Sequence, residues 1–477
     1  MKIHCLFFLL LLGISLNIAA QVNAVAGKVL SHGETLQGVV VTDGHHCVLT
    51  DNSGYYQLPI AEDSRFVYIS SPSGYLVDTQ NGIPRFYKEI DRAEKQSYNF
   101  ELYPDSKDET NHVFIAQADV QLTSKEELGT YRSVLKDCRE LLDNYSGCDV
   151  FGLDCGDIVG DTPALYPDYI KASATLNIPI YRAIGNHDMN YYGRSFETSY
   201  KTFEHYFGPT YYSFNKGQAH YIVINNNFYI GRDYFYMGYV DEKILSWLEE
   251  DLSYVPKGTL VFLAMHIPSR LQDKQESFQY NYSMIADQTV NAEALHALLK
   301  PYVAHIISGH MHYNLNLNYS DSLMEHNTAA VCGTWWRAEV CLDGTPRGYG
   351  VYEITGNKVK WYYKSAGFPK GDQFRAYMPG SSDEYPNDII VNVWNWDKQW
   401  KVEWLEDGKL MGEMIHYTGF DPYAKKLCAD KKKMVYDWIS PVPTTHLFHA
   451  TPQKANARIE IRVTDRFGHV YNEMLTR

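Results

Sequence analysis

The two ends of the chain carry short runs in which apolar and polar residues alternate, the pattern of half-buried β-strands. Near the N-terminus, runs at 39–41 and 55–58 are separated by Asp-Gly and Asn-Ser-Gly turn signals. Near the C-terminus, Trp400, Val402 and Trp404 alternate ahead of Asp407-Gly408. Short strands bounded by such turns predict two all-β sandwich domains, at 22–104 and 370–477.

The stretch 111–365 has a different pattern, in which apolar runs alternate with segments of helical periodicity. One helix is expected to start at a capping box formed by Ser124 and Glu127, and a second carries Ile244, Leu248 and Leu252 at helical spacing. Six runs have the length and composition of buried strands, at 113–118, 150–155, 178–184, 220–225, 260–265 and 303–308. This alternation predicts an α/β domain over 111–365.

The first twenty residues have the pattern of a secretory signal peptide. Lys2 precedes an apolar run at 6–12, and Ala19-Ala20 offers small residues for cleavage. No later stretch has the ~18 uninterrupted apolar residues that a bilayer span requires. We therefore expect a signal peptide at 1–20 and a mature chain that is exported, periplasmic or extracellular, without a transmembrane segment.

The charge balance narrows the choice of partners. The net charge is −14 and the pI about 5.7, which argues against a broad nucleic-acid-binding face, because such a face needs clustered Lys and Arg. A small phosphorylated substrate stays compatible with this charge, since a metal centre supplies positive charge locally.

Five polar clusters each follow one of the predicted strands, and loops that leave neighbouring strands can bring their side chains together. Their carboxylate, carboxamide and imidazole groups form a mixed oxygen and nitrogen set that suits divalent Mn, Fe or Zn. Two such ions about 3.5–4 Å apart can clamp a phosphoryl group and lower the pKa of bound water. The members are Asp119 and Gln121, Asp157 and Asp161, Asn186, His187 and Asp188, His266, and His310 and His312.

In this order the clusters resemble the calcineurin-like metallophosphoesterases, over roughly 111–365. The flanking segments resemble the β domains that accompany this catalytic domain in some bacterial exported members. The resemblance implies a central four-layer αββα domain between two all-β sandwiches. It also implies hydrolysis of a phosphomonoester or phosphodiester at a centre of two divalent metal ions.

The resemblance assigns roles to single residues. It places Asp119, Gln121 and His312 on the first metal, Asn186, His266 and His310 on the second, and Asp157 between them. It implies that His187 contacts the phosphate and protonates the leaving group, with Asp188 orienting it. For Asp161 a structural role, as a helix cap or behind the ligands, is preferred.

Two departures from the family bear on the metals. Gln121 stands where the commonest first cluster has histidine, and its weaker donor favours looser binding or a harder ion at the first site. Gly160 stands where purple acid phosphatases carry a metal-ligating tyrosine, so we expect no tyrosinate–iron colour.

For contacts with the substrate, the sequence indicates candidate residues only. The candidates are Arg194, Trp335, Trp336, Arg337 and Arg347. An aromatic-rich domain interface explains these residues as well as a pocket wall does. The four tryptophans at 394, 396, 400 and 404 fit a sandwich core better than a glycan platform. Cys332 and Cys341 could form a disulfide or stay buried free thiols.

The resulting prediction is an exported phosphoesterase that acts on a small phosphorylated compound or a phosphorylated glycan or lipid. Two other classes stay open. One is a catalytically inactive protein that keeps the fold and binds a surface glycan, and the other is a dinuclear hydrolase of non-phosphate bonds. The complete ligand set with His187 and Asp188 disfavours the first, and the Gly185-Asn186-His187-Asp188 cluster disfavours amide cleavage.

Overall fold

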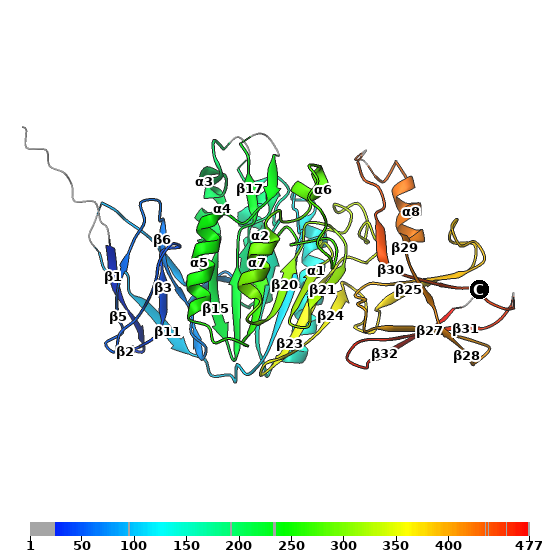
Figure 1. Cartoon of the computed structure of the whole chain (residues 1–477), viewed down its shortest axis with the longest axis horizontal. Helices are drawn as coiled ribbons and strands as arrows, with labels where there is room; N and C mark the ends of the chain where they lie inside the picture. The colour runs from blue at the N-terminus through cyan, green and yellow to red at the C-terminus, as the bar shows by residue number, and fades with distance from the viewer. Residues whose placement is uncertain are drawn as a thin grey trace, which may run out of the picture.

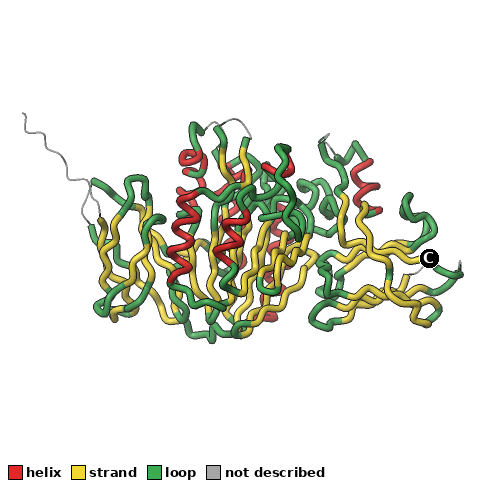
Figure 2. Tube along the Cα trace, in the orientation of Figure 1, coloured by secondary structure: helices red, strands yellow, loops and turns green. Residues whose placement is uncertain are grey.

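The protein consists of three parts in a row along its long axis, two β domains with an α/β domain between them (Figure 1). The computed structural model describes residues 24–93, 96–190, 193–231, 235–434, 436, 438–454 and 456–475. The predicted signal peptide lies outside these ranges. Figure 2 shows the helices gathered in the central part, except for α8 (Pro422–Ala429) in the C-terminal domain.

The N-terminal domain is a sandwich of two sheets, as predicted. Buried and more exposed residues alternate along β1 (Ala24–Ser31), with Val25 and Val29 buried. The alternation of apolar and polar residues in the sequence predicts this pattern. One sheet holds β2 (Glu34–Thr35), β1 (Ala24–Ser31), β11 (Phe100–Pro104), β7 (Tyr75–Leu76) and β5 (Tyr55–Pro59). The other holds β10 (Tyr87–Glu89), β6 (Phe66–Ser70), β3 (Val40–Thr42) and β4 (Cys47–Leu49). A hairpin, β8 (Thr79–Gln80) with β9 (Ile83–Pro84), extends from it.

The central domain is built on two mixed sheets that pack face to face. The first has the order β14 (Ile180–Ala183), β13 (Asp149–Cys155), β12 (Asn111–Gln117), β23 (Gly348–Thr355) and β24 (Lys358–Ser365). The second has the order β15 (Tyr212–Lys216), β16 (Ala219–Val223), β19 (Leu260–Ala264), β20 (Val303–Ser308), β22 (Leu323–Asn327) and β21 (Leu315–Ser320). The six predicted strands are β12, β13, β14, β16, β19 and β20, and each runs parallel to a neighbour within its sheet.

Helices cover the outer faces of both sheets, which completes the predicted αββα arrangement. Against the first sheet pack α1 (Leu128–Leu142) and α2 (Tyr166–Ser173), and against the second α5 (Glu242–Ser253) and α7 (Ala292–Leu299). Figure 1 shows α5 and α7 side by side on the near face. Aromatic rings fill the space between the sheets, with Phe114 stacked on Tyr352 at 4.6 Å and Tyr221 on Phe262 at 5.1 Å.

The predicted capping box is only half present. Glu127 accepts hydrogen bonds from the backbone N–H groups of Thr123 and Ser124, at 2.7 and 3.1 Å. Ser124 makes no reciprocal cap, because a turn follows it and α1 begins at Leu128. The helix at 242–253 begins as expected, with Asp241 capping the N–H of Ile244 at 2.8 Å.

The C-terminal domain is a second sandwich. One sheet contains β25 (Phe374–Tyr377), β26 (Ile389–Val393), β30 (Pro443–Ala450) and β29 (Ile415–Phe420), and the other β28 (Lys409–Glu413), β27 (Lys401–Glu406), β31 (Ile459–Thr464) and β32 (Val470–Leu475). Trp394, Trp400 and Trp404 are buried, the last two in the sandwich core, and Trp396 packs at its edge. This confirms the structural interpretation of these tryptophans.

Smaller elements rise from the central sheets at the end that is uppermost in Figure 1. They are α3 (Phe196–Ser199), α4 (Lys201–Phe207), β17 (Asn227–Tyr229), β18 (Tyr236–Gly238) and α6 (Tyr282–Ile285). None of the helices in the described ranges combines the length and apolar character needed to cross a bilayer.

A buried ion cluster joins the N-terminal linker to the central domain. Lys216, at the end of β15, places its Nζ 2.6 Å from Glu109, 2.7 Å from Asp149 and 3.5 Å from Asp105. The three carboxylates lie close enough to hold a metal ion together, but the Lys216 ammonium is already placed among them. We therefore regard the cluster as a structural clamp between linker and sheet.

Candidate metal centre

The loops that leave the carboxyl ends of five central strands meet at one place. Asp119 and Gln121 follow β12, Asp157 follows β13, Asn186 follows β14, His266 follows β19, and His310 and His312 follow β20. Contacts between these residues, one of them through the backbone N–H of His310, link all seven into one cluster. The structure thus brings together every residue predicted as a metal ligand.

Asp157 occupies the middle of this cluster. Its Oδ2 accepts a hydrogen bond from Nε2 of Gln121 at 2.9 Å and lies 3.2 Å from Nε2 of His266, while its Oδ1 accepts the backbone N–H of His187 at 2.8 Å. Burial alone would raise the pKa of Asp157, but the neighbouring His266 and His187 lower it well below the ordinary value. The carboxylate is therefore ionised at neutral pH and touches residues of both predicted ligand sets.

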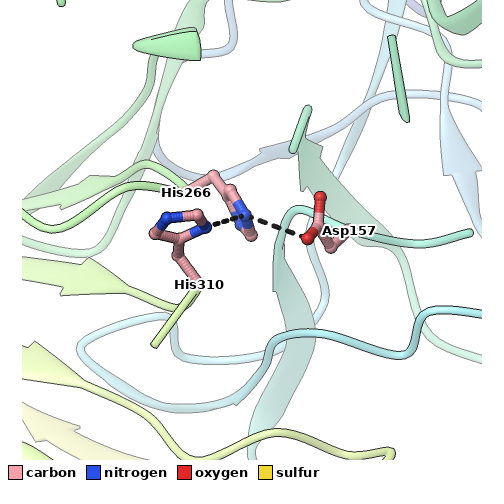
Figure 3. Close-up of side chains that lie close together, drawn as sticks. All are labelled: Asp157, His266 and His310. Carbon is pink, nitrogen blue, oxygen red and sulfur yellow. Dashed lines mark hydrogen bonds and ion pairs between the residues drawn. The ribbon is translucent and has the colours of Figure 1, made fainter. Parts of the chain in front are cut away.

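The orientation of His266 tests whether the cluster suits a cation. Its Nδ1 lies 2.8 Å from the carbonyl oxygen of Cys155, which can only accept, so this nitrogen carries the proton. In the neutral ring Nε2 then presents a lone pair to Oδ2 of Asp157 and to Nδ1 of His310, each at 3.2 Å (Figure 3). Oδ1 of Asn186 lies 3.0 Å from the same nitrogen. Lone pairs that converge in this way require a positive charge among them, and a divalent ion meets that requirement.

The surroundings of His266 and His310 also favour positive charge at this place. Burial lowers the pKa of His266, but Asp157 outweighs this effect and raises the pKa to about 9. Burial and the neighbouring His266 depress the pKa of His310 far below its usual range. The two facing imidazoles therefore share one positive charge, in the position that a metal ion suits.

In the other half of the cluster, Asp119 lies close to the ring of His312 and to the backbone of His310. Nε2 of His312 lies 3.5 Å from Oδ1 of Asp119, and its Nδ1 faces the carbonyl oxygen of Gly333 at 3.3 Å. The backbone N–H of His310 donates to both Asp119 oxygens at 3.0 and 3.2 Å. Asp119, Gln121 and His312 are buried, whereas His310 and His187 are half-buried. The centre therefore opens to solvent beside the two histidines.

Strained backbone accompanies the ligands. Five of the seven have a left-handed conformation, with φ of 56° at Asp119, 41° at Gln121, 52° at Asp157, 72° at His310 and 53° at His312. Residues other than glycine adopt this region at a cost of about 1 kcal/mol or more, and such strain clusters at functional sites. The loops therefore aim these side chains inward against local preference.

Two glycines allow the loops to approach each other this closely. A Cβ on Gly185 would lie 2.1 Å from both N and Oδ1 of Asp157, and one on Gly309 would lie 2.8 Å from Oδ2 of Asp119. These positions demand glycine because no side-chain carbon fits.

His187 is oriented by Asp161, and the prediction that Asp188 has this role is wrong. Nδ1 of His187 lies 2.7 Å from Oδ1 of Asp161. Asp188 instead accepts the backbone N–H groups of Gly185, Ile158 and Val159 at 2.9 to 3.1 Å. Burial, followed by the charge of Asp157, raises the pKa of Asp188 to about 7. Asp188 thus fastens the β14 loop to the β13 loop, because its carboxylate satisfies buried N–H groups there.

The predicted substrate contacts fall into two groups. Trp335 stacks on the His312 ring with centroids 4.3 Å apart, and Arg337 is exposed with its guanidinium 5.7 Å from the Tyr436 ring. Trp336 and Arg347 instead hold the loop. The Trp336 indole donates to the Val120 carbonyl at 2.9 Å, and Arg347 packs 5.5 Å from the Trp336 ring. A half-buried indole N–H needs such an acceptor, so both residues have a structural role in this loop, and a contact with substrate stays a prediction for them.

For Arg194, the contacts within the described part of the chain are local. Its side chain is exposed, and its backbone N–H donates to Oγ1 of Thr198 at 3.1 Å. None of the contacts found for it among the described residues reaches a predicted ligand.

Two residues beside the centre, Tyr236 and Cys332, were not predicted from the sequence to lie there. The Tyr236 ring, from β18, meets the His310 ring edge-on at 5.9 Å. Sγ of Cys332 lies 3.8 Å from Nδ1 of His312 and 3.9 Å from Oε1 of Gln121, and both Cys332 and Cys341 are free thiols. The possible disulfide between them is therefore absent.

Three family models match the chain in series. The model described as calcineurin-like phosphoesterase matches residues 112–314. The N terminal of calcineurin-like phosphoesterase matches 23–105, and the C terminal of calcineurin-like phosphoesterase matches 325–471. Among curated proteins, none matches the chain.

Solved structures with a similar central fold include several phosphatases. A dimetal phosphatase from Danio rerio has a TM-score of 0.40 at 12% identity, over 54% of this chain and 96% of its own. A purple acid phosphatase from yellow lupin seeds has a TM-score of 0.36 at 12% identity, over 69% of this chain and 67% of its own. A 5'-nucleotidase from Candida albicans has a TM-score of 0.32 at 14% identity, over 54% of this chain and 51% of its own.

Proposed function

The chain belongs to the calcineurin-like phosphoesterases, and from this membership we propose that it hydrolyses a small phosphate ester with two divalent ions held between its central sheets. The observation that carries the proposal is the ring of donor atoms around Asp157. Ligand atoms of Asp157, His266 and His310 lie within 4.8 Å of one another. Membership in the family makes the chain a phosphate-ester hydrolase; the two ions and the substrate class are the proposal.

Two sets of residues would hold the ions. Asp119, Gln121 and His312 would hold the first, and Asn186, His266 and His310 the second, with Asp157 shared. When bound, divalent ions supply the positive charge that a polyanionic phosphate needs and make a nearby water more acidic. The oxygen and nitrogen donors suit Mn, Fe or Zn, and the amide of Gln121 favours a harder ion at the first site.

His187 would serve as the acid that protonates the leaving oxygen. Asp161 accepts the Nδ1 proton at 2.7 Å, and Nε2 lies 4.0 Å from the central Asp157 carboxylate. The ring nitrogen that faces the centre is thus the one free to carry a proton toward a bound substrate. Burial lowers the pKa of His187, but Asp157 and Asp161 together raise it above its ordinary value, which favours the protonated acid.

The two other classes receive less support. A surface glycan-binding protein would use exposed aromatic residues as its platform, and the C-terminal tryptophans that could have formed one, Trp394, Trp400 and Trp404, are buried. A dinuclear hydrolase of other bonds would share the ligands, but family membership favours phosphate esters. The substrate we propose is therefore a small phosphorylated compound, or a phosphorylated glycan or lipid.

The test uses the full mature chain loaded with Mn²⁺, Fe²⁺ or Zn²⁺. We expect hydrolysis of p-nitrophenyl phosphate, bis-p-nitrophenyl phosphate or both, and the comparison distinguishes monoesterase from diesterase activity. Asp157→Ala should remove bound metal and activity together, since it deletes the shared carboxylate. Asp143→Ala, at an exposed aspartate, is the matched control. Hydrolysis of neither ester by the metal-loaded chain, or full activity of Asp157→Ala, would refute the proposal.

Export is part of the proposal and rests on the sequence at 1–20. Expression of the full chain in a Gram-negative bacterium should place it in the periplasm with the first twenty residues removed. An intact N-terminus in the cytoplasmic fraction, as read by mass spectrometry, would contradict export.

A further inference from the structure

A series of aromatic rings leads from the metal centre into the C-terminal domain. Trp335 stacks on His312 with centroids 4.3 Å apart and planes at 21°. Trp438 meets Trp335 edge to face, at 4.4 Å and 88°. Tyr436 then stacks on Trp438 at 5.2 Å and 24°. Two ring contacts therefore separate a predicted metal ligand from a tryptophan of another domain.

Trp438 is exposed although its surroundings are firmly packed. It lies in the segment between α8 and β30, where Met434 and Ile439 are 2% and 1% exposed. These two residues share a core cluster with Ala338 and Val340 of the loop that carries Trp335. Trp438 itself remains 58% exposed, despite its contacts with Trp335 and Tyr436. The segment thus holds a large aromatic surface in solvent at a fixed place.

Hydrogen bonds of Asp343 to the C-terminal domain fix the loop that bears Trp335. The Asp343 carboxylate lies 3.0 Å from Nε2 of His446, and the Asp343 carbonyl accepts a hydrogen bond from Asn392 at 2.8 Å. Both partners belong to the C-terminal domain. The position of Trp438 relative to the centre is therefore set by packing and hydrogen bonds between the two domains.

An exposed indole beside a phosphoryl-binding centre suits a flat ring in the substrate. Trp438 meets Trp335 edge to face and stacks on Tyr436, and it is still 58% exposed, which leaves surface for a third ring. Arg337, with its guanidinium 5.7 Å from the Tyr436 ring, adds positive charge at the far end. Stacking of this kind tolerates many ring types because each has a π-face.

We propose that Trp438, supported by Tyr436 and Trp335, binds a planar aromatic ring in the leaving group of the substrate, so that the C-terminal domain determines which phosphate esters are hydrolysed. The proposal rests on the proposed function and adds a specificity-determining residue to it. The flat face of the ring would lie on the indole while the phosphate reaches the metal centre. A purely structural role for Trp438 would leave substrate choice unchanged.

The experiment compares AMP with ribose 5-phosphate, which have the same reacting ester bond and differ in the base. The metal-loaded full chain should hydrolyse AMP with the higher kcat/KM. Trp438→Ala should lower kcat/KM for AMP by about 10- to 100-fold and leave ribose 5-phosphate within about twofold. Trp438→Phe keeps a ring and should retain most of the preference. Tyr103→Ala, at an exposed aromatic of the N-terminal domain, should change neither value.

The outcomes separate this proposal from the one it rests on. Hydrolysis of p-nitrophenyl phosphate without a preference for AMP over ribose 5-phosphate would overturn the role of Trp438. An equal loss on both sugar phosphates in Trp438→Ala would also overturn it, because that loss would reflect a general disturbance of the centre. Inactivity of the wild-type chain toward all phosphate esters would instead refute the proposed function.

Discussion

The Asp161 carboxylate lies 2.7 Å from Nδ1 of His187, and the opposite ring nitrogen of this histidine faces Asp157 at 4.0 Å. A carboxylate on one nitrogen fixes both the tautomer and the direction of an imidazole. His187 is therefore held with Nε2 toward the centre, in the orientation that proton transfer to a leaving group needs.

Asp161→Asn should lower kcat by about 10- to 100-fold, because the amide keeps the contact and loses the charge that stabilises the protonated ring. Asp161 is not among the predicted ligands, so metal content should stay at the wild-type level. Steady-state kinetics with glycerol 2-phosphate, together with elemental analysis, checks both points. Loss of metal in parallel with activity would mean that Asp161 supports the ligands and not His187.

His187→Ala should affect substrates according to their leaving group. An alkoxide leaving group needs a proton, whereas p-nitrophenolate departs without one, so glycerol 2-phosphate should lose more activity than p-nitrophenyl phosphate. A loss of about 100-fold or more is expected for the alkyl ester, with most metal retained.

The double variant sharpens this test. Asp161→Asn combined with His187→Ala should be no slower than His187→Ala alone, because Asp161 acts through the ring. Additive losses, or equal losses on both esters, would show that His187 does not act as the acid.

Gln121→His should tighten binding at the first ion by about tenfold, because imidazole is the stronger donor. The amide nitrogen of Gln121 donates to Asp157 at 2.9 Å, so the amide must turn its oxygen inward to bind an ion. Competition with a chelating dye measures the change. Affinity equal to that of the wild type would remove position 121 from the ligand set.

A pH effect on stability is expected from a histidine pair distant from the ligands. The amide nitrogen of Asn316 donates to Asn395, so its Oδ1 accepts from Nδ1 of His326, and Nε2 of His326 in turn accepts from Nδ1 of His305 at 2.9 Å. Both rings are therefore neutral. Burial, followed by the charge of Arg466, lowers the pKa of His305 from 6.5 to about 4.

Between these two pH values the unfolded chain binds the proton and the folded chain does not. Stability is thus full above pH 6.5 and falls as the pH drops toward 4, by up to about 3 kcal/mol from His305. The thermal midpoint of His305→Gln should depend less on pH over this interval than that of the wild type. Parallel curves for the two proteins would contradict the assignment.

Much of the centre could be predicted from the sequence because each ligand directly follows an apolar strand. Parallel strands end at one edge of a sheet, so Asp119 and Asp157, which follow neighbouring strands of the first sheet, had to converge once their strands were identified. His266 joins them from the second sheet, and only the packing of the two sheets brings it there. The two flanking sandwiches could also be predicted, because the alternation of apolar and polar residues and the turn signals between strands are local sequence patterns.

Other features depend on contacts that no local pattern encodes. Asp161 and Asp188 both stand near His187 in plausible positions, and only the fold shows that Asp188 turns toward backbone N–H groups. The hydrogen bond of the Trp336 indole to the Val120 carbonyl likewise joins residues more than two hundred positions apart. Trp438 packs on Trp335 from about a hundred residues further along the chain, through contacts between domains.

The Lys216 cluster limits how far the chain can be shortened from its N-terminal side. Two of the three acids that neutralise this lysine, Asp105 and Glu109, precede the first strand of the central domain. A truncated gene product starting at residue 111 would keep the pair of Lys216 with Asp149 but lose the contacts of Lys216 with Asp105 and Glu109 that tie the linker to the sheet. The smallest stable hydrolase unit should therefore include this short acidic leader, and a fragment that begins at residue 111 should unfold at a lower temperature than one that begins at residue 105.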